Sequence, residues 1–98
     1  MAEFLFLMHS PPEGGVPDDL WGPYLAGLQS KGVLRGGSAI CGGFCARQDG
    51  EAPPASPRLS GFIRVEAPSL DAARALLEGN PDYEAGGVVE VRELLVTD

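Results

Sequence analysis

The chain has 98 residues, of which 44% are hydrophobic, and its 14 acidic and 7 basic side chains give a net charge of -7. Such a length and composition are typical of one globular domain with a single modest core, so residues 1–98 are predicted to form one domain. The chain has one lysine and dispersed arginines. Without a basic cluster, neither a nucleic acid nor an anionic membrane is expected as a partner.

The compartment is predicted from what the sequence lacks. No apolar stretch approaches the roughly 20 residues that span a bilayer. The opening "MAEFLFLM" has neither the basic start nor the apolar h-region of a signal peptide. We therefore predict a cytoplasmic protein in which Cys41 and Cys45 are reduced thiols.

The first predicted element is a strand over residues 3–8, "EFLFLM", which is apolar at both odd and even positions. A strand of this kind is covered on both faces, so we expect it at the centre of a sheet. The prolines and glycines of "HSPPEGGVP" end it, because they remove donors and break the ladder. His9, the only histidine, lies at that end.

Residues 18–32 are predicted to form a helix. Apolar residues at i, i+3, i+4 and i+7 give it one apolar face. Asp18 or Asp19 is expected to cap its start, and Gly32 its end. Pro23 is tolerated only in the first turn, which places the start near Asp19 or Leu20. The apolar face consists of Trp21, Tyr24, Leu25 and Leu28.

The middle of the chain is predicted to hold two strands joined by a long loop. The glycines of residues 33–40, "VLRGGSAI", indicate a strand at an edge, a bulge, or a close backbone approach. Residues 41–57 are rich in glycine, proline and alanine, and a loop of this length is often mobile or functional. Residues 58–67 alternate as a strand does.

The C-terminal third contains the clearest helix, over residues 68–79. Ser69 is expected to cap it, and Gly79 followed by Pro81 to end it. "NPDYEAGG" is predicted to be a turn, and residues 88–96 the last strand. The apolar face of this helix consists of Leu70, Ala73, Leu76 and Leu77.

The resulting order, β-α-β-β-α-β, is that of an α+β ferredoxin-like sandwich with antiparallel strands in the order 4-1-3-2. The two helices cover one face of this sheet. The other face needs cover for its apolar residues, which a second copy packed sheet on sheet supplies, so we expect a homodimer. The sequence does not tell which set of alternating residues faces the partner.

The same topology brings distant residues to one end of the domain. Strands 1 and 2 end at the edge where strands 3 and 4 begin. We therefore expect a pocket at this edge. The residues predicted to gather there are His9, Trp21, Cys41, Cys45, Tyr83 and Glu84.

Residues 61–94 resemble the end of the YCII-related, or DGPF-domain, family: a strand, a helix beginning with serine and an acidic residue, then C/N-P, an aromatic-Glu-x-Gly-Gly step and V-E-V-R. The first half of the chain resembles the family less closely. Together the two halves cover most of the chain apart from residues 41–57, which lie outside the resemblance. The residues that carry the C-terminal resemblance are Ser69, Leu70, Asp71, Ala72, Asn80, Pro81, Tyr83, Glu84, Gly86, Gly87, Val89, Glu90, Val91 and Arg92.

The resemblance implies a dimeric α/β barrel made of two ferredoxin-like subunits. A few relatives act on small cyclic or aromatic molecules, including a dehydrochlorinase. Some carry a histidine on helix 1 and an aspartate near the D-P step as a proposed acid-base pair. This chain has Trp21 and Asn80-Pro81 at those positions, and residues 48–57 lack the DGPF tripeptide. The family's pair is therefore not carried over.

Four residues on the predicted elements are candidates for a site. Histidine is a common acid/base residue, and His9 is our candidate general acid or base; the alternative is a strand-end histidine bonded to a backbone carbonyl. Arg35 either holds an anionic ligand or is an exposed strand arginine. Trp21 and Tyr24 either form a pocket wall or pack in the core.

Tyr83 and Glu84 are the last candidates. Glu84 is an acid or base if desolvated, although binding to backbone N–H groups of the turn is favoured, with Tyr83 packed on the dimer seam. Cys41 and Cys45 do not match a zinc or redox motif, and no nucleotide-binding glycine pattern is present, so we predict neither metal nor cofactor.

The sequence thus leaves two functions open. One is a small enzyme that acts on a compact organic or aromatic molecule by acid/base chemistry. The other is a non-catalytic module for small-ligand binding or dimeric assembly. The substrate, the role of the cysteines and the role of loop 41–57 are not determined by the sequence.

Overall fold

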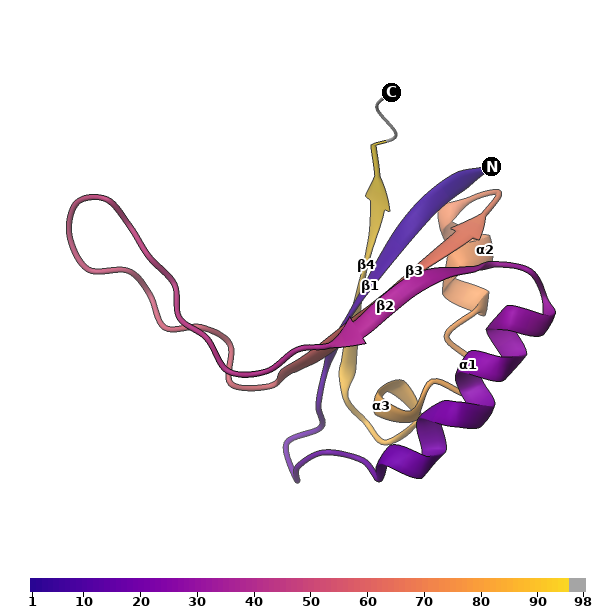
Figure 1. The fold of residues 1–98 in the computed structure, drawn as a ribbon, viewed down its shortest axis with the longest axis horizontal. Helices are drawn as coiled ribbons and strands as arrows, with labels where there is room; N and C mark the ends of the chain where they lie inside the picture. Colours follow the sequence, from indigo (N-terminus) through magenta and orange to yellow (C-terminus); the bar gives the residue numbers. More distant parts are fainter. Residues whose placement is uncertain (96–98) are drawn as a thin grey trace.

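The computed structural model describes residues 1–95 and contains the six predicted elements in the predicted order, with two short helices in addition (Figure 1). A 3-10 helix, η1, precedes α1, and a four-residue helix, α3, precedes the last strand. The elements are β1 (Ala2–His9), η1 (Asp18–Leu20), α1 (Trp21–Ser30), β2 (Leu34–Ala39), β3 (Leu59–Ala67), α2 (Leu70–Ala75), α3 (Pro81–Glu84) and β4 (Val88–Leu94).

The four strands form one antiparallel sheet in the order β2-β3-β1-β4, which confirms the predicted ferredoxin-like topology. β1 is central, as predicted from its apolar residues at both odd and even positions. Phe6 lies between Ile63 of β3 and Val91 of β4. β2 pairs with β3 alone and contains an irregularity between Leu34 and Gly36, so it is the predicted glycine-rich edge strand.

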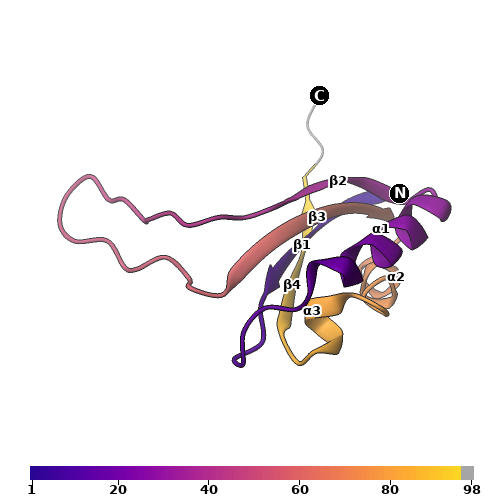
Figure 2. The same ribbon diagram turned by 60° about the horizontal axis from the view of Figure 1, so that its bottom comes forward.

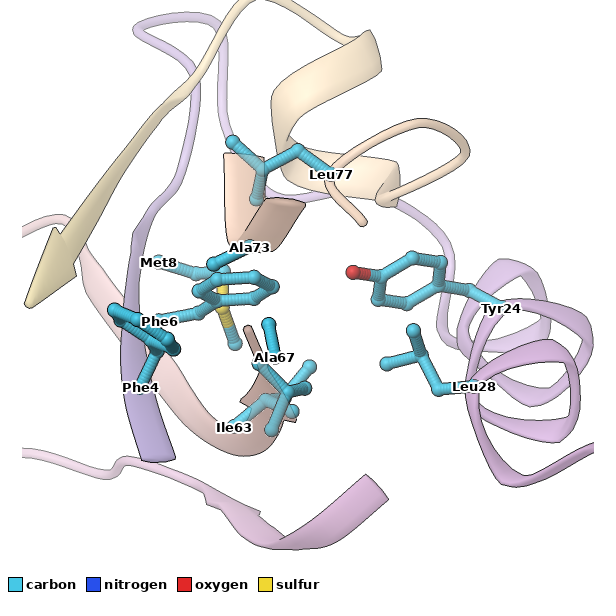
Figure 3. Packing of buried hydrophobic residues seen from close by; sticks show 10 residues of the cluster. Phe4, Phe6, Met8, Tyr24, Leu28, Ile63, Ala67, Ala73 and Leu77 are labelled. Atoms are coloured by element: carbon cyan, nitrogen blue, oxygen red, sulfur yellow. The ribbon is translucent and has the colours of Figure 1, made fainter. Parts of the chain in front are cut away.

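All three α-helices cover the same face of the sheet (Figure 2). Alternate strand residues point to them and are buried, and Tyr24 and Leu28 reach back from α1 (Figure 3). Each fully buried apolar side chain of this kind contributes about 1.5–3 kcal/mol to stability. The core consists of Phe4, Phe6, Met8, Tyr24, Leu28, Ile63, Val65, Ala67, Ala73 and Leu77.

The residues of opposite parity lie on the open face of the sheet. Leu7 pairs with Phe62 on one side and Glu90 on the other, and Leu5 is the next residue of this face. Charged residues flank this apolar centre and form three ion pairs. The pairs are Arg35–Glu66 at 2.9 Å, Arg64–Glu3 at 3.2 Å and Arg92–Glu90 at 2.7 Å.

The start of the first helix differs from the prediction. Neither Asp18 nor Asp19 caps it: both lie within η1, and no side chain makes a cap hydrogen bond to η1 or α1. Pro17 precedes the 3-10 turn and accepts the hydrogen bond of the Leu20 N–H through its carbonyl oxygen. Pro23 does lie in the first turn of α1, as predicted, and Gly32 beyond its end has a φ of 73°.

The second helix is capped as predicted, because the Ala72 N–H donates to Ser69 Oγ at 3.1 Å. Its apolar face is smaller than expected: Leu70, at the first helical position, is 53% exposed. The predicted turn after it contains α3. Asn80 Oδ1 accepts from the Tyr83 N–H at 3.1 Å, and Pro81 occupies the first turn, both of which favour a helix start. The predicted last residue of β4, Val96, lies outside the described residues.

Loop 41–57 leaves the sheet between β2 and β3 and extends away from the body of the domain (Figures 1 and 2). Residues 41–51 are all exposed, Cys41 and Cys45 among them. Of the helices described, none has the length and apolarity needed to cross a membrane.

Candidate functional site: a cleft floored by Asp82

A cleft of about 660 Å³ lies between α1 and the β2 edge of the sheet, on the helix-covered side. We call it the Asp82 cleft. Its walls are largely apolar, because Trp21 and Leu25 of α1 face Leu34 of β2 and Ile63 of β3 across it. A predominantly apolar concavity with a few polar groups is typical of small-molecule sites.

The glycines of the strands leave this space open. Gly36, Gly37 and Gly61 all line the cleft, where they provide no side chain to fill it. A Cβ on Gly37 would lie 2.6 Å from the carbonyl oxygen of Phe62, and one on Gly61 would lie 2.9 Å from that of Ser38. The close backbone approach predicted for "VLRGGSAI" is therefore confirmed, and it helps to shape the cleft.

Asp82, in the first turn of α3, supplies the carboxylate of the cleft. Only 1% of its surface is exposed. Its Oδ2 atom accepts a hydrogen bond of 2.7 Å from Ser60 Oγ. Met8 pairs with Gly61 and His9 with Leu59, so Ser60 is an extra residue in β3. Such a bulge re-aims a side chain, here toward the carboxylate of α3.

The surroundings of this carboxyl group suit it to hold or release a proton. Ser60 Oγ also lies 3.2 Å from the carbonyl oxygen of Met8. When Asp82 is ionised, the hydroxyl donates to Oδ2; when a proton sits on Oδ2, Asp82 donates to Oγ and the hydroxyl turns to Met8. Both forms are therefore hydrogen-bonded. Within residues 1–95, Oδ1 accepts no hydrogen bond, so it is free for a ligand donor.

His9 borders a different hollow. It has the parity of the open face, and it lies beside Pro12, residues 56–58 and residues 86–88 in a hollow of about 580 Å³. We call this the His9 hollow. Ser10 borders both hollows. The structure thus does not place His9 with Trp21, although both lie near the same end of the sheet.

Trp21 and Tyr24 stand edge to face, with ring centroids 6.2 Å apart, but they play different parts. Trp21 lines the Asp82 cleft. Tyr24 is 8% exposed, and its hydroxyl donates to the carbonyl oxygen of Leu76 at 2.8 Å. Burial raises the pKa of Tyr24 above 10.0, and the nearby Asn80 side chain opposes that rise. Tyr24 is thus a core residue that joins α1 to the end of α2.

The other predicted site residues lie outside the cleft lining. Arg35 pairs with Glu66 and donates to the carbonyl oxygens of Gly32 and Leu34. Tyr83 is 45% exposed. Glu84 Oε2 accepts a 3.4 Å bond from the N–H of Gly79, which is the turn-binding role favoured from the sequence. Cys41 and Cys45 lie on the extended loop and are not brought to this group.

Sequence reasoning missed Asp82 and Ser60. One signal for Asp82 was available: Asn-Pro is a helix start, which would have put Asp82 in a first turn facing the sheet. No local signal marks the Ser60 bulge, since it depends on pairing with β1. Within residues 1–95, no three His, Cys, Asp or Glu side chains lie close enough together to hold a metal ion.

The fold and the cleft define a ferredoxin-like α+β domain with a buried carboxylate beside its central strand. The chain belongs to the YCII-related domain family, whose model matches residues 21–97, and the resemblance stated from residues 61–94 is thereby confirmed. No match is found among curated proteins.

One solved structure similar to this chain is that of 5-chloro-2-hydroxyhydroquinone dehydrochlorinase (TftG) from Burkholderia phenoliruptrix AC1100, in complex with 2,5-dihydroxybenzoquinone. The two chains are 22% identical and superpose with a TM-score of 0.53 over 92% of this chain and 91% of that chain. The likeness shows the shared fold.

Proposed function

We propose that this protein is a small enzyme that transfers a proton on a compact organic or aromatic molecule bound in the Asp82 cleft. The observation that carries the proposal is the 1% exposed carboxylate of Asp82, held by Ser60 in a largely apolar cleft. A carboxyl group with a hydrogen-bond partner in both protonation states is suited to general acid/base work.

The step we propose is a single proton transfer. A bound ring lies between Trp21 and the glycine-lined strands and presents a proton to Asp82. The proton moves to the carboxylate, the electron pair of the broken bond stays on the ligand, and Ser60 keeps the carboxyl group in place. The apolar walls exclude water, which strengthens the interaction between the ligand and Asp82.

Two observations support a compact ring as the substrate. The fold is shared with TftG, which by its name acts on a chlorinated hydroxyhydroquinone and was solved with a dihydroxybenzoquinone. A cleft of about 660 Å³ lies within the usual size range of small-molecule sites. The acid/base role falls on Asp82 rather than on His9, because His9 borders the other hollow.

We further propose that the protein is a homodimer through the open face of the sheet. Leu5, Leu7 and Phe62 form an apolar centre there with ion pairs around it, the usual arrangement of an interface. Leu7→Lys is expected to yield a monomer in sedimentation at micromolar concentration. A wild-type monomer under the same conditions would contradict the dimer.

The enzyme proposal is tested by turnover. Wild-type protein is incubated with a panel of hydroxylated and chlorinated arenes, and proton exchange or chloride release is followed. Asp82→Asn is expected to lower the rate about 100-fold, the usual contribution of a general acid or base. His9→Gln is the matched control. Binding without turnover would favour the non-catalytic ligand-binding module instead, and activity retained in Asp82→Asn would exclude this mechanism.

A further inference from the structure

We propose that the Asp82 cleft selects uncharged ring compounds with a hydroxyl donor and excludes ring carboxylates. This inference rests on the proposed function and narrows its substrate class. It follows from the charges and hydrogen-bonding groups that line the cleft.

The ionisable side chains that line the cleft are both acidic. They are Asp82 at the floor and Asp18 at the mouth, and none of the lining residues, all within residues 1–95, is a lysine or arginine. A ligand carboxylate would lie beside the buried Asp82 carboxylate and meet no cation. Like charges at close range in such a site repel strongly.

The nearest arginines have other partners. Arg35, on the strand that forms one wall, donates to Glu66 at 2.9 Å and to two backbone carbonyl oxygens. Arg64 lies 3.2 Å from Glu3 and donates to the carbonyl oxygen of Arg35. Either arginine would have to abandon an ion pair to reach a ligand anion.

The polar groups of the cleft favour a ligand that carries a hydrogen-bond donor. An ionised carboxylate only accepts hydrogen bonds, and Asp82 Oδ1 has no partner among residues 1–95. Two of the lining serines already use their hydroxyl protons: Ser60 donates to Asp82, and Ser38 donates to the carbonyl oxygen of Ala39 at 2.9 Å. A ligand hydroxyl therefore satisfies Asp82, while a methyl ether or a carboxylate does not.

The test uses two matched pairs of probes on the full chain. The affinities of hydroquinone and 1,4-dimethoxybenzene are compared to measure the effect of the hydroxyl donor. The affinities of 4-hydroxybenzamide and 4-hydroxybenzoate are compared to measure the effect of the negative charge. The indole N–H resonance of Trp21, the only tryptophan, reports binding in the cleft. In each pair the first compound is expected to bind at least about tenfold more tightly. These comparisons need no variant.

The variant Asp82→Asn then tests whether the charge of Asp82 causes this selectivity. The preference for 4-hydroxybenzamide over 4-hydroxybenzoate is expected to fall at least about fivefold, because the buried negative charge is gone. Arg35→Gln is the control and is expected to leave the preference unchanged. Equal binding of 4-hydroxybenzamide and 4-hydroxybenzoate to the wild type would overturn the inference and leave the proposed function standing. Absence of binding by every ring compound would overturn both.

Discussion

Two hollows flank the end of β1, and they differ in what lies behind them. The Asp82 cleft is backed by the core, with Met8 at 3% exposure and the apolar residues of α1 in its walls. The His9 hollow has a similar volume, about 580 Å³ against about 660 Å³, but loop residues form most of it. Met8 and His9 are neighbours in sequence that point to opposite faces.

This difference teaches that residue type alone does not define a site. A histidine is the most common acid/base residue, yet here it lies among loops. The carboxylate of Asp82, which sequence reasoning missed, is buried with a fixed hydroxyl partner. Burial and a fixed partner are what set a group apart for chemistry.

Gly87 lies in the backbone between the two hollows, and a substitution there is expected to cost the most stability. A Cβ on Gly87 would lie 2.8 Å from the carbonyl oxygen of Asp82, 3.1 Å from the nitrogen of Pro11, and in collision with the carbonyl oxygen of His9. Because all three are backbone atoms, Gly87→Ala is expected to lower the free energy of unfolding by about 2–3 kcal/mol. Urea unfolding measures this loss.

Gly27→Ala is the matched control. Gly27 lies inside α1 with open space around its Cβ position, so alanine is expected to stabilise the protein by about 0.5–1 kcal/mol. If both variants unfold at the same urea concentration, then the backbone seam between the hollows is not tightly packed.

One serine in each hollow gives the next comparison. Ser60→Ala leaves a buried carboxylate oxygen without its partner, which is expected to cost about 1–3 kcal/mol of stability. Ser56, in the His9 hollow, is exposed and accepts a 3.4 Å bond from the N–H of Arg58. Ser56→Ala is therefore expected to cost less than about 0.5 kcal/mol. Equal losses in chemical denaturation would remove the distinction between the hollows.

Tyr24 tests the core behind the Asp82 cleft. Tyr24→Phe loses the bond to Leu76 and is expected to cost about 1 kcal/mol at neutral pH. Because burial raises the pKa of Tyr24 in the folded protein, the unfolded chain releases this proton first as pH rises past 10.0. Wild-type stability should therefore fall above pH 10.0 more steeply than that of Tyr24→Phe. Identical pH curves from urea unfolding would argue against a buried hydroxyl.

The smallest effect is expected at His9. His9→Gln is expected to change the affinity for hydroquinone by less than about twofold, because His9 does not line the Asp82 cleft. NMR titration on the Trp21 indole measures this affinity. A large loss in His9→Gln, with binding intact in Asp82→Asn, would move the ligand site to the His9 hollow.

Local patterns in the sequence were enough to predict the elements and their pairing. The apolar parities of β1 placed it centrally, Ser69 capped α2, and Gly32 followed the end of α1, because each of these signals acts over a few neighbouring residues. The predicted end of the second helix at Gly79 was wrong, since α2 ends at Ala75. The missed cap at Asp18 and the exposed Leu70 arose where a short 3-10 turn or a shortened helix replaced the regular pattern.

Which polar groups meet depends on the packing of distant segments. Ser60 and Asp82 are 22 residues apart, and they touch because a bulge in β3 turns one toward a short helix that holds the other. Likewise, strand alternation at the end of β1 sends Met8 and His9 to different sides. Contacts between distant segments depend on register and packing, which no local pattern encodes, and the candidate site consists of such contacts.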